Sequence, residues 1–199
     1  MNIEIFKFPT ITEELYPIVS CIFKDACLEK ERQGIHFSFA SFTIEDVKKY
    51  YTMVEGHKMY LLIAMDGDTP IGALMCQSRQ KGFYYYVSHD YLGVIDSYKG
   101  KGVASLLFQT FLEICRKEKY DFIVSVTNPK SVSSVTYHLR MGFRKFAMNY
   151  CKESRSISFL YPLRKMRFLN IEFFRILLYF GFSSMSCIKN FAKYLRVNY

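Results

Sequence analysis

Tryptophan is absent from this 199-residue chain, and its six cysteines are scattered singly. No two cysteines have the CxxC spacing of a zinc site, and six are too few for a disulfide scaffold, so we expect reduced, mostly buried thiols and no metal. A secretory leader is also lacking, because the opening stretch, MNIEIFKFPTITEELYP, mixes acidic and apolar residues. These absences predict a cytoplasmic protein.

Acidic residues are scarce in the second half of the chain. Residues 1–97 carry 9 Lys and Arg against 13 Asp and Glu, whereas residues 98–199 carry 18 against 5, so the second half is the source of the net charge of +9. Such a field favours a polyanionic partner, whether a phosphorylated cofactor, nucleic acid or an anionic membrane, and lysines that merely solvate the surface are the alternative. The charge comes with no nucleic-acid reading motif, so we expect no nucleic-acid partner.

Long uninterrupted apolar runs are missing as well. The apolar stretch 166–199 is interrupted by Glu172 and Arg175 and by a Gly- and Ser-containing break, so it does not qualify as a membrane span. Its spacing predicts two basic amphipathic helices that pack on their own domain, on a partner subunit such as a second copy, or on anionic lipid. We therefore divide the chain into a domain, residues 1–163, and a helical extension, residues 164–199.

What the chain does contain is a series of apolar patterns at helical or strand spacing. A capping-box pattern from Thr10 to Glu13 predicts where the first helix begins, and DGDTP predicts a hairpin turn. The order of elements, two helices, a β meander, a βαβ unit and an αββ unit, predicts a mixed α/β sheet. The predicted helices are 10–31, 43–54, 103–119 and 133–141, and the predicted strands are 58–65, 71–78, 83–95, 122–127, 143–151 and 156–163.

The glycine-rich stretch SYKGKGVASLL, residues 97–107, joins the last strand of the meander to the next helix. A strand that runs into a glycine turn and then a helix presents unpaired N–H groups and the positive end of the helix dipole, so it is a candidate anion site. A P-loop is excluded, because one residue separates Gly100 from Gly102. A dinucleotide fingerprint is excluded because Ser105 replaces its third glycine.

Two motifs resemble those of the GNAT N-acetyltransferases. LGVIDSYKGKGVASLL is similar to that family's Leu-x-Val strand and its (Gln or Arg)-x-x-Gly-x-(Gly or Ala) turn, with Lys99 in the place of Gln or Arg. NPKSVSSVTYHLRMGF, residues 128–143, aligns without a gap with the second signature, Asn-Pro-x-Asn-x-x-Ala-x-x-Phe-Tyr-x-Lys-Leu-Gly-Phe. The resemblance covers roughly residues 3–163 and implies a mixed, mostly antiparallel sheet with a splayed strand pair.

The resemblance implies that acetyl-CoA, or another acyl-CoA, binds at the splayed strands as a co-substrate. Backbone N–H groups from Lys99 to Ala104 would hold the pyrophosphate, and the backbone of Leu92 and Val94 would pair with the pantetheine arm like an added strand. Glycines suit this role because they leave the backbone unblocked. The predicted cofactor contacts are Leu92, Val94, Lys99, Gly100, Lys101, Gly102, Val103, Ala104, Asn128, Ser131 and Ser134, with Ser131 in place of the second Asn.

The same comparison implies a proton donor on the helix predicted at 133–141. His138 stands where the family has the tyrosine that protonates the departing CoA thiolate, and Tyr137 stands one position earlier. A histidine can donate that proton, and a structural role for His138 in the helix is the alternative. Tyr137, also a candidate, points about 100° away on an ideal helix, which favours the core.

A direct transfer also needs a base for the acceptor amine. We predict Asp90, because strand alternation places Asp90 and Ser88 on the face of Leu92 and Val94, and His89, the second choice, on the other. An Asp that marks a β-bulge or a sheet edge is the alternative.

The predicted function is transfer of an acetyl group from acetyl-CoA to an amine of a small molecule or a peptide, with a strand N–H that stabilises the oxyanion. Two alternatives stay open: an acyl-CoA-binding module without chemistry, and an adaptor that contacts a membrane or a partner through the basic extension. The aromatic loop GIHFSFASF, residues 34–42, suits a cationic or ring-bearing acceptor, although such loops vary widely within one fold.

Overall fold

The computed structural model describes residues 3–32, 43–45, 57–81, 84–150 and 155–164 of the chain. Within them, seven strands form one sheet in the order β1-β2-β3-β4-β5-β7-β6, and β4 with β5 is the one parallel pair. The elements are β1 Ile3–Phe8, α1 Leu15–Arg32, β2 Met59–Asp66, β3 Thr69–Lys81, β4 Tyr84–Val94, the 3₁₀ turn η2 Asp96–Tyr98, α3 Val103–Lys117, β5 Phe122–Thr127, α4 Val132–Arg140, β6 Arg144–Tyr150 and β7 Arg155–Pro162. The predicted mixed, mostly antiparallel sheet is confirmed.

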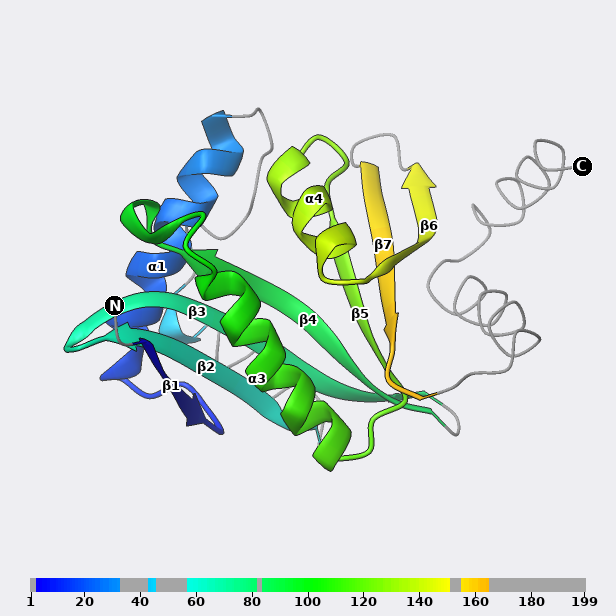
Figure 1. Ribbon diagram of the computed structural model, residues 1–199, viewed down its shortest axis with the longest axis horizontal. Helices are drawn as coiled ribbons and strands as arrows, with labels where there is room; N and C mark the ends of the chain where they lie inside the picture. Colours follow the sequence, from blue (N-terminus) through cyan, green and yellow to red (C-terminus); the bar gives the residue numbers. More distant parts are fainter. Residues whose placement is uncertain (1–2, 33–42, 46–56, 82–83, 151–154, 165–199) are drawn as a thin grey trace, which may run out of the picture.

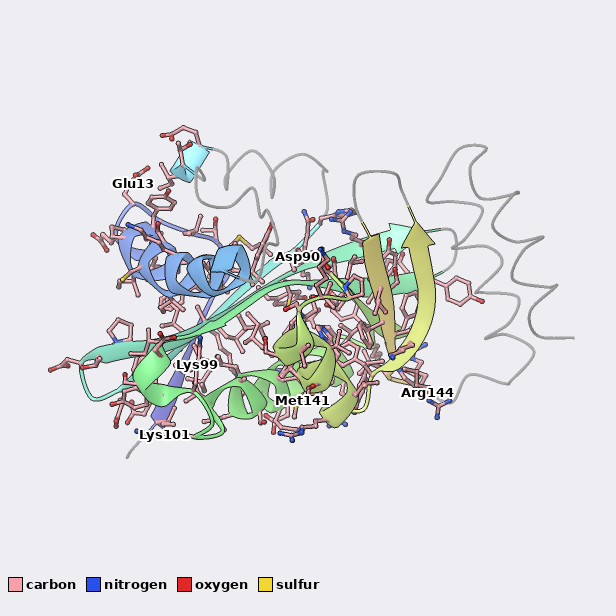
Figure 2. All side chains as sticks on the ribbon, turned by 90° about the horizontal axis from the view of Figure 1, so that it is seen from above. Glu13, Asp90, Lys99, Lys101, Met141 and Arg144 are labelled. Carbon is pink, nitrogen blue, oxygen red and sulfur yellow. The ribbon has the colours of Figure 1, made fainter. Side chains whose placement is uncertain are left out.

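Helices cover both faces of the sheet, with α1 on one side and α3 and α4 on the other (Figures 1 and 2). Strand alternation divides β2 accordingly, because Leu62 belongs to the core under α3 whereas Leu61 and Ile63 belong to the core under α1. Apolar residues of α3 recur at helical spacing, and Leu107 and Phe111 are fully buried. Each such side chain contributes about 1.5–3 kcal/mol by leaving water.

The β2–β3 hairpin forms as predicted from its two apolar runs and its turn. The strands pair antiparallel out to Asp66 and Thr69, and Gly67 between them adopts a φ of 59°. Left-handed backbone of this kind favours glycine in a tight hairpin turn. The hairpin supplies β3, against which β4 pairs along its whole length from Tyr84 to Val94.

The N-terminal part differs from the prediction. Residues 3–8 form an edge strand, β1, that the sequence analysis did not assign, and α1 begins at Leu15 instead of residue 10. The start is dictated by Pro17, which lacks an N–H and is tolerated in a first turn but not in a helix interior. The hydroxyl of Thr12 accepts a hydrogen bond from the Leu15 N–H at 3.3 Å, so Thr12 caps the helix and the predicted box at Thr10 is wrong.

Two other predicted segments fall largely outside the described residues. Of the helix predicted at 43–54, Ile44 and Glu45 are described and are helical. The extension predicted from residue 164 onward is described only at its first residue, so the domain boundary stays a prediction. Among the described helices, none is long and apolar enough to cross a membrane.

Candidate active site

The sheet opens between β4 and β5. These strands pair in parallel from Tyr86 with Phe122 to His89 with Ser125, and the pairing stops there. Beyond that point β4 continues along β3 to Val94, while β5 continues along β7. Figure 1 shows the two strands together at one end and apart at the other. The predicted splayed strand pair is therefore present, and we call the opening the splay and its closed end the vertex.

The β4 backbone lines the splay with groups that β3 does not use. The Ile95 N–H donates to the Ile71 carbonyl oxygen at 3.1 Å, so these two residues form a hydrogen-bonded antiparallel pair. Such pairs alternate with non-hydrogen-bonded ones, in which the backbone groups point away from the partner strand. Leu92 and Val94 occupy the alternate positions, so their N–H and C=O groups point into the splay. This geometry matches the predicted use of these two residues.

The glycine turn ends β4 and begins α3. Gly100 and Gly102 adopt φ values of 77° and 87°, and a Cβ on either would meet nothing within 4 Å. The glycines are therefore needed for left-handed backbone, and they leave open space above the turn. The first N–H with an intrahelical acceptor is that of Leu106, which bonds to the Gly102 carbonyl oxygen at 3.0 Å. The N–H groups from Val103 onward to that point lie at the positive end of the helix dipole.

Two lysine side chains flank this turn (Figure 2). Lys99 Nζ lies 2.7 Å from Asp96 Oδ1, and Lys101 Nζ lies 4.9 Å from the centre of the Tyr98 ring. The Tyr98 hydroxyl donates to Asp66 Oδ2 at 2.8 Å, which raises the pKa of Tyr98. Both lysines are thus held near the turn by contacts that an anion can supplement.

The position of α3 depends on a glycine that the sequence analysis did not single out. A Cβ at Gly72 of β3 would lie 2.9 Å from Val103 Cγ1 and 3.3 Å from Leu107 Cδ1. Only glycine allows the first turn of α3 to approach the strand this closely. An isolated glycine inside an apolar strand is the signal that marks such an approach.

The start of α4 carries the remaining predicted cofactor contacts. The side chain of Asn128 accepts a hydrogen bond from the Lys130 N–H at 2.9 Å, and the Ser134 hydroxyl accepts one from Thr127 at 2.8 Å. Ser131 is 1% exposed, and among the described residues its hydroxyl has no hydrogen-bond partner. A buried hydroxyl without a partner is a group that a ligand can satisfy.

His138 lies inside the core at the vertex. Its Nδ1 is 2.6 Å from the Ser134 carbonyl oxygen, and its Nε2 is 2.8 Å from Ser125 Oγ. The ring stacks on Phe159 with centroids 4.7 Å apart. The placement of His138 beside the last β4–β5 pair suits a proton donor. The hydrogen bonds that occupy both of its ring nitrogens suit a structural role.

Tyr137 packs against the core under α3, as its angle on the helix predicts. Burial raises the pKa of its phenol, so the hydroxyl stays protonated at neutral pH. Its oxygen lies 3.5 Å from His89 Nε2, and the His89 ring is itself 4% exposed. The second-choice base is therefore buried in the vertex beside the two candidate acids.

A β-bulge interrupts β4 at Asp90. Met75 of β3 pairs with Tyr91 and Cys76 pairs with His89, so Asp90 is the extra residue between them. One extra residue reverses the alternation of side chains beyond it. The alternative interpretation of Asp90, as the mark of a bulge, is confirmed, and its role as a base stays a prediction.

The bulge corrects the predicted faces of β4. The His89 ring lies 6.0 Å from that of Phe108, on the face of α3, and Leu92 and Val94 pack against the same core. Ser88, one residue before His89, faces the opposite side of the sheet. The prediction that Ser88 shares the face of Leu92 and Val94 is therefore wrong. The prediction that His89 lies on the other face from Leu92 and Val94 is also wrong. Both assumed strict alternation, which the inserted residue interrupts.

Asp90 and Ser88 nevertheless act as a pair, since the Ser88 hydroxyl donates to Asp90 Oδ1. Figure 2 places Asp90 in the middle of the sheet, well separated from Lys99 and Lys101 at the turn. The Asp90 carboxylate thus lies along β4 near the vertex, and the glycine turn lies beyond the far end of β4. No group of three or more His, Cys, Asp or Glu side chains in the described part of the chain could hold a metal ion.

Comparisons with known proteins agree with this architecture. The model of the acetyltransferase (GNAT) family matches residues 24–143. N-alpha-acetyltransferase 30 of Schizosaccharomyces pombe is 26% identical over 92 residues, which are 46% of this chain and 61% of that protein. The chain thus spans less than two thirds of the length of that curated relative.

Solved structures share the fold along most of the chain. The NatC complex bound to Gag peptide and CoA contains a chain that is 20% identical, with a TM-score of 0.58 over 81% of this chain and 99% of that one. The Arabidopsis thaliana Naa50 structure with the bisubstrate analogue CoA-Ac-MVNAL is 15% identical, with a TM-score of 0.57 over 80% and 98% of the two chains. The PaiA N-acetyltransferase of Thermoplasma acidophilum, in complex with coenzyme A, is 14% identical, with a TM-score of 0.58 over 81% and 99%.

These likenesses show the fold, and the family match runs through the turn, the splay and the start of α4. Since that match extends over more than half of the chain, the chain belongs to the GNAT acetyltransferase family.

Proposed function

We propose that the chain transfers an acetyl group from acetyl-CoA to an amine. The observation that carries the proposal is the divergence of β4 from β5 beside the glycine turn. The edge of β4 at Leu92 and Val94, along which no described strand pairs, and the N-terminus of α3 then lie at one opening. These are the two backbone surfaces that an amide-containing arm and a pyrophosphate need.

The proposed contacts extend along the length of acetyl-CoA. Backbone N–H groups of Gly100, Gly102, Val103 and Ala104 hold the pyrophosphate, whereas the N–H groups of Lys99 and Lys101, also predicted to do so, already donate to the carbonyl oxygens of Asp96 and Tyr98. The side chains of Lys99 and Lys101 add positive charge beside the pyrophosphate. Amides of the pantetheine arm pair with Leu92 and Val94, as a peptide does when it adds a strand to a sheet. The buried hydroxyl of Ser131, which has no partner in the part of the chain that the structure describes, gains a hydrogen bond from the same ligand.

The reacting groups meet at the vertex. A neutral amine attacks the thioester carbonyl, and Asp90 accepts the amine proton directly or through a water molecule. A β4 backbone N–H stabilises the oxyanion, and His138 is the acid for the departing thiolate. The proposed acid and base thus come from different elements. His138 of α4 is hydrogen-bonded to Ser125 at the end of the β4–β5 ladder, and Asp90 follows that end by one residue in β4.

We further propose that the acceptor is the α-amine of a peptide. Support comes from the relatives, since one is an N-alpha-acetyltransferase and two of the structures hold a peptide or a peptide-bearing bisubstrate analogue. Support also comes from Val126 of β5, which is 61% exposed and lies on the sheet face opposite the buried Ser125. An exposed apolar side chain beside the splay suits contact with the first side chains of a peptide better than it suits a highly charged small amine.

Location and assembly also enter as proposals. A cytoplasmic protein is consistent with the free thiols of Cys21, Cys76 and Cys115. Association through the extension, with a membrane surface, a second copy or another protein, is a second proposal that rests on the sequence of residues 164–199. Both are secondary to the chemistry proposed for the splay.

The test measures free thiol released from acetyl-CoA with two acceptor panels, short peptides with free α-amines and small polyamines or aminoglycosides. We expect turnover with peptides and a further preference set by their first two residues. Turnover on small amines alone contradicts the peptide acceptor. Acetyl-CoA binding without turnover on either panel favours a binding module without chemistry. The hydrogen bonds that both ring nitrogens of His138 make within the protein would then have a structural role.

A further inference from the structure

Ser125 and His138 form a buried hydrogen-bond chain at the vertex. The chain runs from the Ser134 carbonyl oxygen through Nδ1 and Nε2 of His138 to Ser125 Oγ, and from there to the carbonyl oxygen of His89, with lengths of 2.6, 2.8 and 3.1 Å. Ser125 and His138 are each 3% exposed. Because His89 and Ser125 are the last pair of the β4–β5 ladder, the chain ties α4 to β4 where the strands part.

The ends of this chain determine where its hydrogens lie. Both ends are carbonyl oxygens, which only accept, so Nδ1 of His138 carries a hydrogen whether the ring is neutral or charged. In the neutral ring Nε2 carries a lone pair and no hydrogen, and the Ser125 hydroxyl donates either to Nε2 or to the His89 carbonyl oxygen. In the charged ring Nε2–H donates to Ser125 Oγ, and the hydroxyl donates to His89. Every link then has one hydrogen, so the chain can carry a proton from the ring to Ser125.

His138 has no direct route to a substrate in this arrangement. Its Nδ1 is turned to the backbone of its own helix, and its Nε2 is turned to Ser125. Phe159 stacks on the ring and Phe143 makes a T-shaped contact with it. Among the described residues, the titratable rings in contact with it are those of His89 of β4 and Tyr137 of α4. Any proton that leaves Nε2 therefore passes to the Ser125 hydroxyl first.

On the basis of the acetyl transfer proposed above, we propose that Ser125 is a catalytic residue, the hydroxyl through which His138 protonates the departing thiolate. The Ser125 hydroxyl turns from the His89 carbonyl oxygen to the thiolate. Its O–H bond then breaks as the S–H bond forms, and the Nε2–H bond breaks as a new Ser125 O–H bond forms. Thiolate and imidazolium become thiol and neutral imidazole, so charge balances. The amine releases one proton in the same turnover, and His138 regains one from solvent, so no net proton is consumed.

The kinetic test compares Ser125→Ala with Ser78→Ala. Ser78 also carries a buried hydroxyl, which accepts the Lys58 N–H at 2.6 Å, but it lies on β3 outside the splay. We expect Ser125→Ala to lower kcat by about 10-fold to 100-fold with KM for acetyl-CoA changed by less than about threefold, and Ser78→Ala to change neither. Ser125→Thr, which keeps a hydroxyl, restores most of the rate.

A proton inventory in mixtures of H₂O and D₂O separates a relay from a packing defect. If two protons move in the transition state, kcat of the wild type depends on the deuterium fraction along a curve. In Ser125→Ala only one proton moves, so the dependence becomes linear. Equal kcat values for Ser125→Ala and Ser78→Ala, in a wild type that is active, overturn the relay alone. A wild type that binds acetyl-CoA but acetylates no amine overturns the proposed function and the relay together.

A second readout needs no turnover. In the full chain labelled with ¹⁵N-histidine, the neutral His138 ring is expected to carry its hydrogen on Nδ1, with Nε2 bare and its resonance shifted in Ser125→Ala. A neutral ring with its hydrogen on Nε2 overturns the proposal, even if Ser125→Ala itself fails to fold, because Nε2 would then donate to Ser125 without an imidazolium. His138→Asn assigns the resonance among the four histidines.

Discussion

The turn before α3 and the vertex of the splay are built from different parts of the chain. At the turn the groups proposed to bind the ligand are backbone N–H groups, and Gly100 and Gly102 allow the left-handed backbone that positions them. At the vertex the groups proposed to act in catalysis are side chains from β4, β5 and α4, which contact one another although they are distant in the sequence. A backbone site is specified by a short local motif, whereas a side-chain site is specified by the register of the whole sheet.

The two regions also differ in what they do for the proposed reaction. The turn is the proposed site for the part of acetyl-CoA that does not react, so changes there are expected to alter affinity. The vertex holds the proposed acid and base, so changes there are expected to alter kcat at constant affinity. Substitutions in each region test whether the turn affects only the affinity for acetyl-CoA and the vertex only kcat.

The largest effect is expected at the bulge. Asp90→Asn keeps an acceptor for the Ser88 hydroxyl but cannot take a proton from the amine, so kcat is expected to fall about 100-fold with little change in acetyl-CoA affinity. Asp121→Asn is the matched control, because that carboxylate accepts the Tyr85 N–H at 2.9 Å outside the splay. Initial rates with saturating acceptor measure the effect, and an unchanged kcat in Asp90→Asn contradicts its role as the base.

A smaller effect is expected at the turn, and it concerns affinity alone. Gly102→Ala places a Cβ at a φ of 87°, which strains the backbone by about 1–2 kcal/mol and shifts the N–H groups at the start of α3. Gly67→Ala is the matched control, because it creates similar strain at a φ of 59° in the β2–β3 turn, also with nothing within 4 Å.

Calorimetric titration with acetyl-CoA and thermal melting of both variants separate these effects. We expect similar losses of stability, and a loss of affinity of about 10-fold in Gly102→Ala only. Equal affinities in the two variants show that the turn does not hold the cofactor.

Ser131→Ala is expected to act in opposite directions on stability and affinity. Without ligand, removing a buried hydroxyl that lacks a partner among the described residues is neutral or slightly stabilising. With ligand, one hydrogen bond is lost, so acetyl-CoA binds about three- to tenfold more weakly. Ser133→Ala, at an exposed position of the same helix turn, is the control, and melting curves with and without acetyl-CoA measure both effects. A variant destabilised without ligand contradicts the assignment.

The smallest effect is expected from the lysines beside the turn. Lys99→Ala and Lys101→Ala each remove one exposed charge, so affinity for acetyl-CoA falls about two- to fivefold at low salt and less at high salt. Lys58→Ala, whose ammonium group pairs with Glu118 at 2.6 Å elsewhere, serves as the control. Salt-independent losses indicate that the lysines act by shaping the turn instead of by their charge.

The sequence predicted the parts of the fold that depend on local patterns. The hairpin around Gly67, strand β5 and helix α3 follow from spacing and turn residues, and their positions agree with the structure. The edge strand β1 and the true start of α1 were missed, because β1 pairs with a strand some 55 residues away and a capping pattern outweighed the constraint from Pro17.

The candidate site divides in the same way. The backbone roles of Leu92 and Val94 were accessible from a motif and agree with the hydrogen-bond alternation of β4. The faces of Ser88 and His89 were predicted wrongly, because strict alternation was applied along β4 although a bulge at Asp90 was the alternative interpretation. Gly72 and Ser125 were also missed, since the importance of each comes from a neighbour that is distant in sequence.

The most direct test of the account is a crystal structure of the full chain with acetyl-CoA. We expect the pyrophosphate within hydrogen-bond distance of the N–H groups between Gly100 and Ala104, the pantetheine amides paired with Leu92 and Val94, and the thioester at the vertex near Ser125. Acetyl-CoA bound elsewhere, or a turn left empty at saturating concentration, contradicts the central claim that the splay and the glycine turn form one cofactor site.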